Sequence, residues 1–91
     1  MKRTDLIWLP TVIYRMEHHH NLTPGQVEEM FINQPNYRYL GDGHFFSSLG
    51  AAFGQADDGR RITAIFIKKS QSEMMIISAR DMNWKERIKY L

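Results

Sequence analysis

The chain has 91 residues, a formal net charge of +2 at pH 7 and no cysteine, so we expect one domain, residues 1–91, with a single core and neither disulfides nor thiolate metal sites. The apolar run near the N-terminus is interrupted by Pro10 and followed by Arg15, and no window approaches the roughly 20 apolar residues of a membrane span. These features predict a cytoplasmic protein that does not enter a membrane.

The small net charge hides an asymmetry along the chain. Residues 1–58 carry four Lys/Arg against seven Asp/Glu, a net charge of −3, whereas residues 59–91 carry eight against three, a net charge of +5. A basic C-terminal part suits a polyanion or an acidic surface on a protein partner, and it is also compatible with an ordinary solvated surface.

Two helices are predicted in the N-terminal part. Pro10 can begin the first, whose inner face would hold Ile13, Met16 and His20 at helical spacing. The second should begin after Thr23 as N-cap, because Gln26 follows at the spacing of a capping box. Its ends and its inner face are marked by Leu22, Pro24, Val27, Met30, Phe31 and Pro35.

Aromatic and β-branched residues punctuated by Gly and Asp follow. They predict strands at about 37–40, 50–56, 61–68 and 73–79, and the short turns between them imply antiparallel pairing. A last helix should begin after Asn83, which has capping-box spacing to Glu86, and should pack through Trp84, Ile88 and Leu91. The predicted fold is therefore α+β with two layers: two N-terminal helices, a four-stranded antiparallel sheet and a C-terminal helix.

Histidine and arginine supply the candidate chemistry. His18, His19 and His20 point about 100° apart on a helix, so they do not converge on one metal ion. His20, beside the turn into the second helix, and His44, in a Gly-rich turn, have the side chain whose ordinary pKa suits proton transfer; a structural role for His20 is equally compatible.

Arg60 or Arg61 begins one predicted central strand and Arg80 ends its neighbour, so an antiparallel pairing brings these ends together. Arg87 could join them from the last helix. Planar guanidinium groups suit phosphate, because they stay charged and donate paired hydrogen bonds. The alternative is a set of structural salt bridges with the nearby acidic residues, which are Asp57, Asp58, Asp81 and Glu86.

Several motifs are missing from the sequence. It has no phosphate loop, no nucleotide-binding fingerprint, no nucleophile elbow and no carboxylate-rich metal cluster. We therefore expect neither a metal ion nor an organic cofactor.

Three segments, "HHNLTPGQVEEMF", "GQADDGRRITAIFI" and "IISARDMNWKERIKY", resemble the BrnT-type toxins of bacterial and archaeal type II toxin–antitoxin systems, which are small ribonucleases related in fold to RelE. The resemblance covers about residues 8–90. Its most specific part is Ile-Ser-Ala-Arg, residues 77–80, followed by Glu86, Arg87 and Tyr90; Gly59 with Arg60 comes next.

The chain also departs from the family pattern. The usual Lys-His-Gly is His19, His20 and Asn21 here, a commonly basic position near the second strand is Leu49, and Trp-Asp-Pro is replaced by the Trp-Leu-Pro of residues 8–10. The resemblance is thus to a divergent branch of the family.

The resemblance implies a RelE-like fold and a metal-independent endoribonuclease that inhibits translation. Arg60 and Arg80 would stabilise charge, with His20 or His44 transferring protons. Arg61, Arg87 and Tyr90 would bind RNA, although Tyr90 could instead close the core. The implied partners are the RNA substrate, an adjacently encoded antitoxin, BrnA-like or other, and possible operator DNA contacted through the antitoxin complex. The alternative, favoured by Leu49, is a non-catalytic binding module that acts in a protein or DNA-bound complex.

Overall fold

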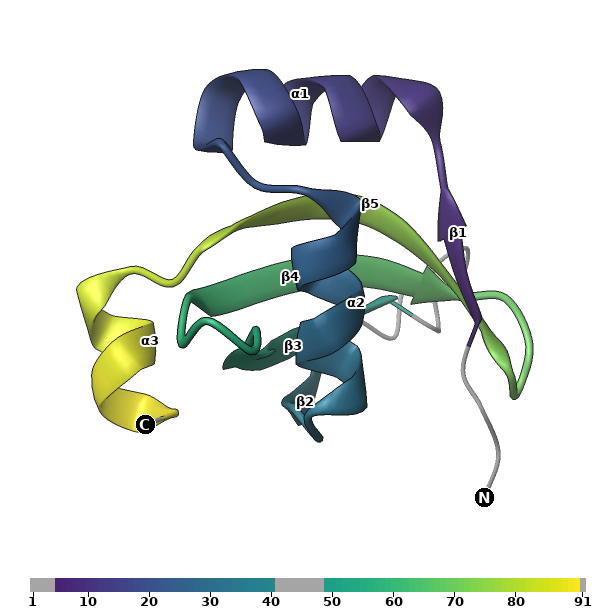
Figure 1. Ribbon diagram of the computed structural model, residues 1–91. Coiled ribbons are helices and arrows are strands. Elements are labelled where there is room, and N and C mark those ends of the chain that lie inside the picture. Colours follow the sequence, from purple (N-terminus) through teal and green to yellow (C-terminus); the bar gives the residue numbers. More distant parts are fainter. Residues whose placement is uncertain (1–4, 41–48, 91) are drawn as a thin grey trace.

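The computed structural model describes residues 5–40 and 49–90. Its helices and strands form an α+β domain, in agreement with the predicted fold class (Figure 1). In chain order they are β1 (Asp5–Trp8), α1 (Pro10–His20), α2 (Pro24–Ile32), β2 (Asn36–Tyr39), β3 (Leu49–Gln55), β4 (Arg61–Lys68), β5 (Glu73–Asp81) and α3 (Trp84–Lys89).

The sheet has the strand order β1-β5-β4-β3-β2. Strands β2 to β5 pair in antiparallel fashion, as predicted. Strand β1 was not predicted: it pairs with β5 in parallel, from Asp5 opposite Glu73 to Trp8 opposite Ile76. The sheet is therefore five-stranded and mixed rather than four-stranded and antiparallel. The four residues of β1, which end two positions before Pro10, carry too little pattern to distinguish a strand from a connection.

The N-terminal helices begin where the sequence predicts. Helix α1 starts at Pro10, and helix α2 has the complete capping box between Thr23 and Gln26. The inner face of α1 differs from the prediction, because Val12 and Met16 are buried whereas His20 is exposed. One buried residue per turn fits a helix that lies over the margin of a sheet.

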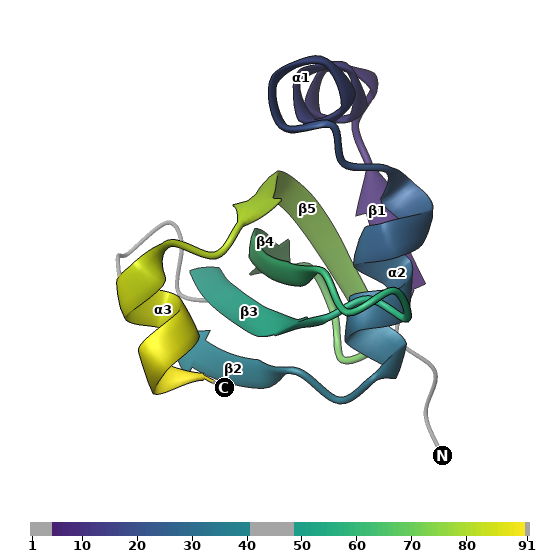
Figure 2. The same ribbon diagram turned by 60° about the vertical axis from the view of Figure 1, so that its left-hand side comes forward.

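Two apolar clusters lie on opposite faces of the sheet. Helices α1 and α2 cover one face, where the central residues of the core include Met16, Leu22, Met30 and Ile76. Helix α3 packs on the other face (Figure 2), over Ala51, Phe53 and Met82 with Ile65 and Tyr90 at the margin of the cluster.

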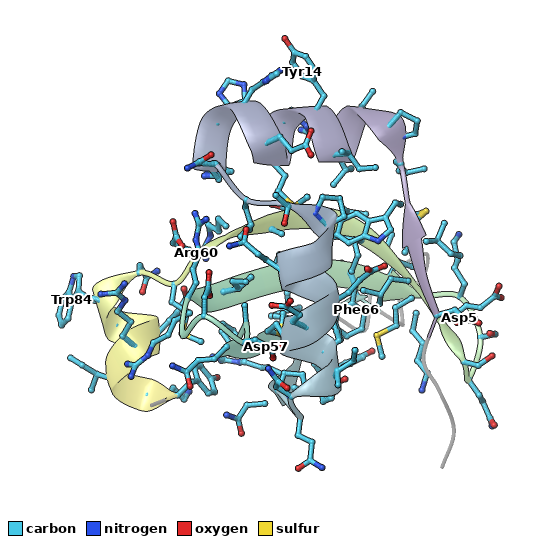
Figure 3. The ribbon with its side chains drawn as sticks, in the orientation of Figure 1. Asp5, Tyr14, Asp57, Arg60, Phe66 and Trp84 are labelled. Carbon is cyan, nitrogen blue, oxygen red and sulfur yellow. The ribbon has the colours of Figure 1, made fainter. Side chains whose placement is uncertain are left out.

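Helix α3 packs against the sheet through a different side of the helix from the one predicted. Trp84 and Ile88 are each 67% exposed, and Trp84 points away from the rest of the molecule (Figure 3). Glu86 is hydrogen-bonded to Arg80 instead, so it faces the sheet. Residues two positions before and after Glu86 point about 200° away from it, which places Trp84 and Ile88 in solvent. The third predicted packing residue, Leu91, lies outside the described residues.

Within residues 5–40 and 49–90, none of the helices is both long enough and apolar enough to span a membrane.

Candidate functional site

The adjoining ends of β4 and β5 bring together three of the seven predicted site residues, Arg60, Arg61 and Arg80. Ile62 lies opposite Asp81 and Thr63 opposite Arg80, so the two strand ends meet as expected. Neighbouring residues on a strand point to opposite faces. Arg60 and Asp81 consequently lie on the α1 side of the sheet, whereas Arg80 lies on the α3 side. The structure thus divides the predicted arginine cluster into two groups.

On the α1 side, the guanidinium of Arg60 is held by four hydrogen bonds. Its Nε and Nη2 donate to the two carboxylate oxygens of Asp81 over 2.7 and 3.0 Å. Its Nη1 and Nη2 donate to the backbone oxygens of Asn21 and His20, each over 2.5 Å. In Figure 3 Arg60 lies beneath the C-terminal end of α1. Both edges of this guanidinium are therefore used to join that helix end to β5.

On the α3 side, Arg80 forms a paired contact with Glu86. Its Nη1 and Nη2 donate to the two carboxylate oxygens over 2.8 and 2.9 Å, and Nη1 also donates to the backbone oxygen of Asp81 over 3.0 Å. The other edge of the guanidinium, formed by Nε–H and the second Nη2–H, makes no hydrogen bond within residues 5–40 and 49–90. Because the Arg80 side chain is 36% exposed, that edge can bind a second anion through paired hydrogen bonds.

Glu86 fixes the orientation of Arg80. Its carboxylate also accepts hydrogen bonds from the Thr63 hydroxyl and from the backbone N–H of Asn83, each over 2.9 Å. These contacts, that from Arg80 above all, lower the pKa of Glu86 to about 2. Glu86 therefore stays ionised at neutral pH and serves as an anchor rather than as a group that exchanges protons.

His20 lines a groove of about 240 Å³ between α1 and β5. Strand β1 pairs with β5 only as far as Ile76, so within the described part of the chain residues 77–79 of β5 present a free edge to this groove. Arg15 and His19 line it from the helix. A groove between two basic side chains and a strand edge can hold an anionic ligand beside the His20 imidazole. His18 lies outside it and contacts the ring of Tyr14.

The other predicted site residues lie apart from these groups or serve the fold. Arg87 is exposed on α3, close enough to Asp81 to help lower the pKa of that carboxyl, after the larger effects of Arg60. The Tyr90 ring stacks on Phe53, with centroids 4.1 Å apart and planes at 6°, so it closes the core under α3. Arg61 is half-buried, and His44 lies outside the described residues.

One basic residue on the α3 face was not predicted from the sequence. Arg38 is exposed on β2, opposite Ala51, which belongs to the cluster under α3. The alternation Tyr-Arg-Tyr of residues 37–39 was the available signal, because alternate residues of a strand share a face. Metal ligands do not converge in the described part of the chain, where no group of three or more His, Asp and Glu side chains could hold an ion.

No family model matches the chain, and no curated protein sequence matches it. Among solved structures, the chain is similar to the crystal structure of the ribonuclease toxin BrnT of Brucella abortus, with a TM-score of 0.69. The alignment covers 88% of this chain and 97% of that one. This chain has the BrnT fold. The two sequences are only 17% identical, so the BrnT likeness is established for the architecture and not for individual residues.

Proposed function

We propose that the chain is a divergent BrnT-type toxin, an endoribonuclease of the cytoplasm that cleaves RNA without a metal ion and so inhibits translation. The observation that carries the proposal is the Arg80 guanidinium, with one edge fixed by Glu86 and the other open to solvent on a BrnT fold. A guanidinium held in this way is prepared to bind a phosphate without first being ordered.

The proposed chemistry uses the nucleophile that RNA carries itself. The 2′-oxygen attacks the adjacent phosphorus and loses its proton to a base. The bond from phosphorus to the 5′-oxygen then breaks, and that oxygen takes up a proton, leaving a cyclic phosphate and a free 5′-hydroxyl. Arg80 would stabilise the negative charge of the five-coordinate intermediate. His20 lies on the α1 side of the sheet, in the groove along the edge of β5, so it would transfer a proton to or from an RNA strand that crosses this edge next to Arg80.

In this proposal Arg60 does not stabilise charge on the substrate, which was the role predicted from the sequence. Both of its edges are used by Asp81 and by the backbone oxygens of His20 and Asn21. We assign it a positioning role, in which it holds the end of α1 and thereby the His20 side chain. Arg61 and Arg87 would add phosphate contacts that are independent of RNA sequence.

The test is expression of the chain alone in bacteria, together with cleavage of total RNA by the purified protein with and without a chelator. We expect slowed growth and cleavage that the chelator does not affect. Arg80→Ala should relieve the growth defect and lower the cleavage rate by about a hundredfold, the usual effect of removing one charge-stabilising donor. A folded wild type that neither slows growth nor cleaves RNA would refute the proposal.

The proposed partner is an antitoxin encoded beside the toxin, BrnA-like or of another family, through which the complex could also contact operator DNA. Trp84 and Ile88 on α3 are largely exposed, and Lys85 and Lys89 lie on the same short helix. An antitoxin segment with acidic and apolar side chains would complement this surface, which belongs to the helix that Glu86 joins to Arg80.

One observation favours a second function. Leu49 begins β3 at a position that is usually basic in BrnT-type toxins, and Arg80 already has one anionic partner in Glu86. Both features fit a binding module that keeps the fold without catalysis. Binding of RNA or of the antitoxin by a protein that leaves total RNA intact would support this alternative.

A further inference from the structure

A second cavity, of about 560 Å³, lies where the C-terminal end of α2, the start of β2, the end of β3 and the end of α3 meet. Its polar walls are formed by Asn33, Gln34, Asn36, Gln55 and Asp57, and Phe53 and Tyr90 supply aromatic surface. The described residues that line it include four side-chain amides and one carboxylate but no Lys or Arg. This composition suits a neutral ligand rich in hydrogen-bonding groups, and it disfavours a phosphate.

Part of the wall is fixed by internal hydrogen bonds. The Asn33 amide donates to the backbone oxygen of Gln55 over 3.0 Å and to the Asp57 carboxylate over 2.9 Å. The Gln55 amide donates to the backbone oxygen of Gly59 over 3.1 Å. The amides of Gln34 and Asn36 make no hydrogen bond to any residue of 5–40 or 49–90. They are therefore available to a ligand, in a wall that is already ordered around them.

These two amides also stand where backbone preferences favour other residues. Gln34 has a φ of 59°, directly after the C-cap of α2, a conformation that glycine or asparagine adopts at lower cost. Asn36 begins β2 although asparagine is depleted in strands. Neither residue is the best choice for stabilising the helix end or the strand in which it lies. We take this as a sign that the side chains bind a ligand.

The register of the sheet connects the cavity to Arg80. Asn36 lies opposite Phe53, Phe53 opposite Thr63, and Thr63 opposite Arg80, so the four residues form one row across β2 to β5 on the α3 side. Neighbouring strands are about 4.8 Å apart, which puts Asn36 roughly 14 Å from Arg80 along this row. Phe53 and Thr63 lie beneath Tyr90 and Glu86 of the last helical segment, so a single RNA strand with one phosphate on Arg80 would pass beside α3 and could place a base a few nucleotides away in the cavity.

We propose that this cavity, lined by Gln34 and Asn36, is a nucleobase subsite that sets the RNA sequence preference, with adenine as the preferred base. A side-chain amide presents a donor beside an acceptor, the arrangement that matches one edge of adenine and that Asn and Gln use to bind it. Asp57 can accept a further hydrogen bond from the exocyclic amino group. The inference rests on the proposed function, because it identifies the substrate class of the same site.

The experiment uses the full chain and two readouts. The first maps cleavage sites in a pool of random-sequence single-stranded RNA. The second measures, by fluorescence anisotropy, the binding of short 2′-O-methyl RNAs that cannot be cleaved and that carry one variable base in a constant background. The variants are Gln34→Gly and Asn36→Ala, with Glu17→Gln on the far side of the sheet as the control. Gln34→Gly removes the amide while relieving the unfavourable backbone conformation, so it should fold at least as well as the wild type.

We expect the wild type and Glu17→Gln to favour adenine over the other bases by roughly five- to tenfold in both readouts, as one amide–base pair allows. Each cavity variant should reduce that ratio to within about twofold while the mean affinity for RNA changes little, because phosphate contacts supply most of it. A wild type that binds RNA without base preference, or cavity variants with an undiminished preference, would overturn the inference and leave the ribonuclease proposal standing. Base-selective binding without cleavage would support the inference and refute catalysis.

Discussion

Arg80 and Glu86 face each other through two nearly equal hydrogen bonds, of 2.8 and 2.9 Å, that join the end of β5 to the first turn of α3. The pair holds the helix in place and keeps one edge of the guanidinium free. Stability and the candidate chemistry thus depend on the same carboxylate.

The first prediction is a stability loss in acid that depends on Glu86. Its pKa falls from 4.5 to about 2 on folding, chiefly through Arg80, so the folded state is favoured while the carboxylate is ionised. This stabilisation is complete above pH 4.5 and is lost as the pH falls through about 2. After allowance for solvent screening it should amount to roughly 2 kcal/mol. Denaturant unfolding at a series of pH values measures it.

Glu86→Gln is the matched control for that experiment. Glutamine keeps the shape and loses the titration, so the acid-dependent slope should become shallower but should persist in part, because the pKa of Asp81 is also lowered, mainly by its hydrogen bonds from Arg60. An unchanged slope would show that Glu86 is not coupled to folding.

The second prediction contrasts the two arginines. Arg60→Ala should destabilise the domain by about 2 kcal/mol, because it leaves the Asp81 carboxylate and two backbone oxygens without their donor. Arg80→Lys should cost less stability, about 1 kcal/mol, yet slow RNA cleavage at least tenfold, since an ammonium cannot hold a carboxylate and a phosphate through paired hydrogen bonds. Thermal unfolding and cleavage rates per folded molecule separate the two effects. Equal losses in both assays for both variants would contradict the division of roles.

The third prediction concerns the cap of α2. The Thr23 hydroxyl accepts a hydrogen bond from the backbone N–H of Gln26 over 3.2 Å. Thr23→Ala should therefore lower the free energy of unfolding by about 1 kcal/mol. Cleavage per folded molecule should stay the same. If cleavage disappeared at an unchanged melting temperature, Thr23 would belong to the functional site.

The fourth prediction uses the same substitution at two glycines. A Cβ at Gly54 would lie 2.8 Å from Cγ of Met30 and 3.0 Å from Cβ of Pro35, whereas one at Gly25 would meet nothing nearer than 3.9 Å. Gly54→Ala should destabilise the domain by about 2 kcal/mol through overpacking. Gly25→Ala, within α2, should be neutral or should stabilise it by about 0.5 kcal/mol. Chemical denaturation of both variants provides the comparison.

The fifth prediction concerns inhibition by the proposed antitoxin. RNA binding should weaken steeply with salt, because it depends on phosphate contacts. The antitoxin complex should withstand moderate salt, because it would also bury Trp84 and Ile88. Titrations over ionic strength, with a short RNA and with the neighbouring gene product, measure the difference. In Trp84→Ser/Ile88→Ser the complex should become salt-sensitive while RNA binding stays unchanged. RNA binding at full affinity to the preformed complex would exclude inhibition by occlusion.

Local signals predicted much of this fold. Thr23 with Gln26 and Asn83 with Glu86 gave both capping boxes, and the β-branched runs gave strands β4 and β5. Strand β1 depends on a partner almost seventy residues away in the sequence, and no pattern within its four residues records that pairing.

In the candidate site, too, the local sequence predicted some features, whereas others depend on tertiary contacts. The sequence was sufficient to predict that Arg60 and Arg80 lie at adjoining strand ends. It did not show that the two side chains point to opposite faces, because Arg60 lies just before the strand and its neighbour Arg61 was an equal candidate. The rotation of α3 was likewise set by the Glu86 contacts rather than by its apolar spacing.

The parallel pairing of β1 with β5 has a consequence for synthesis of the chain. Residues 5–8 are synthesised well before residues 73–76, with which they pair. Arg80, Glu86 and the helix that holds them follow later still. Pairings between such distant segments form late and slowly. A nascent chain that extends only as far as β4 would lack both the partner of β1 and the Arg80–Glu86 pair, so we expect it to have no candidate site and no activity toward RNA.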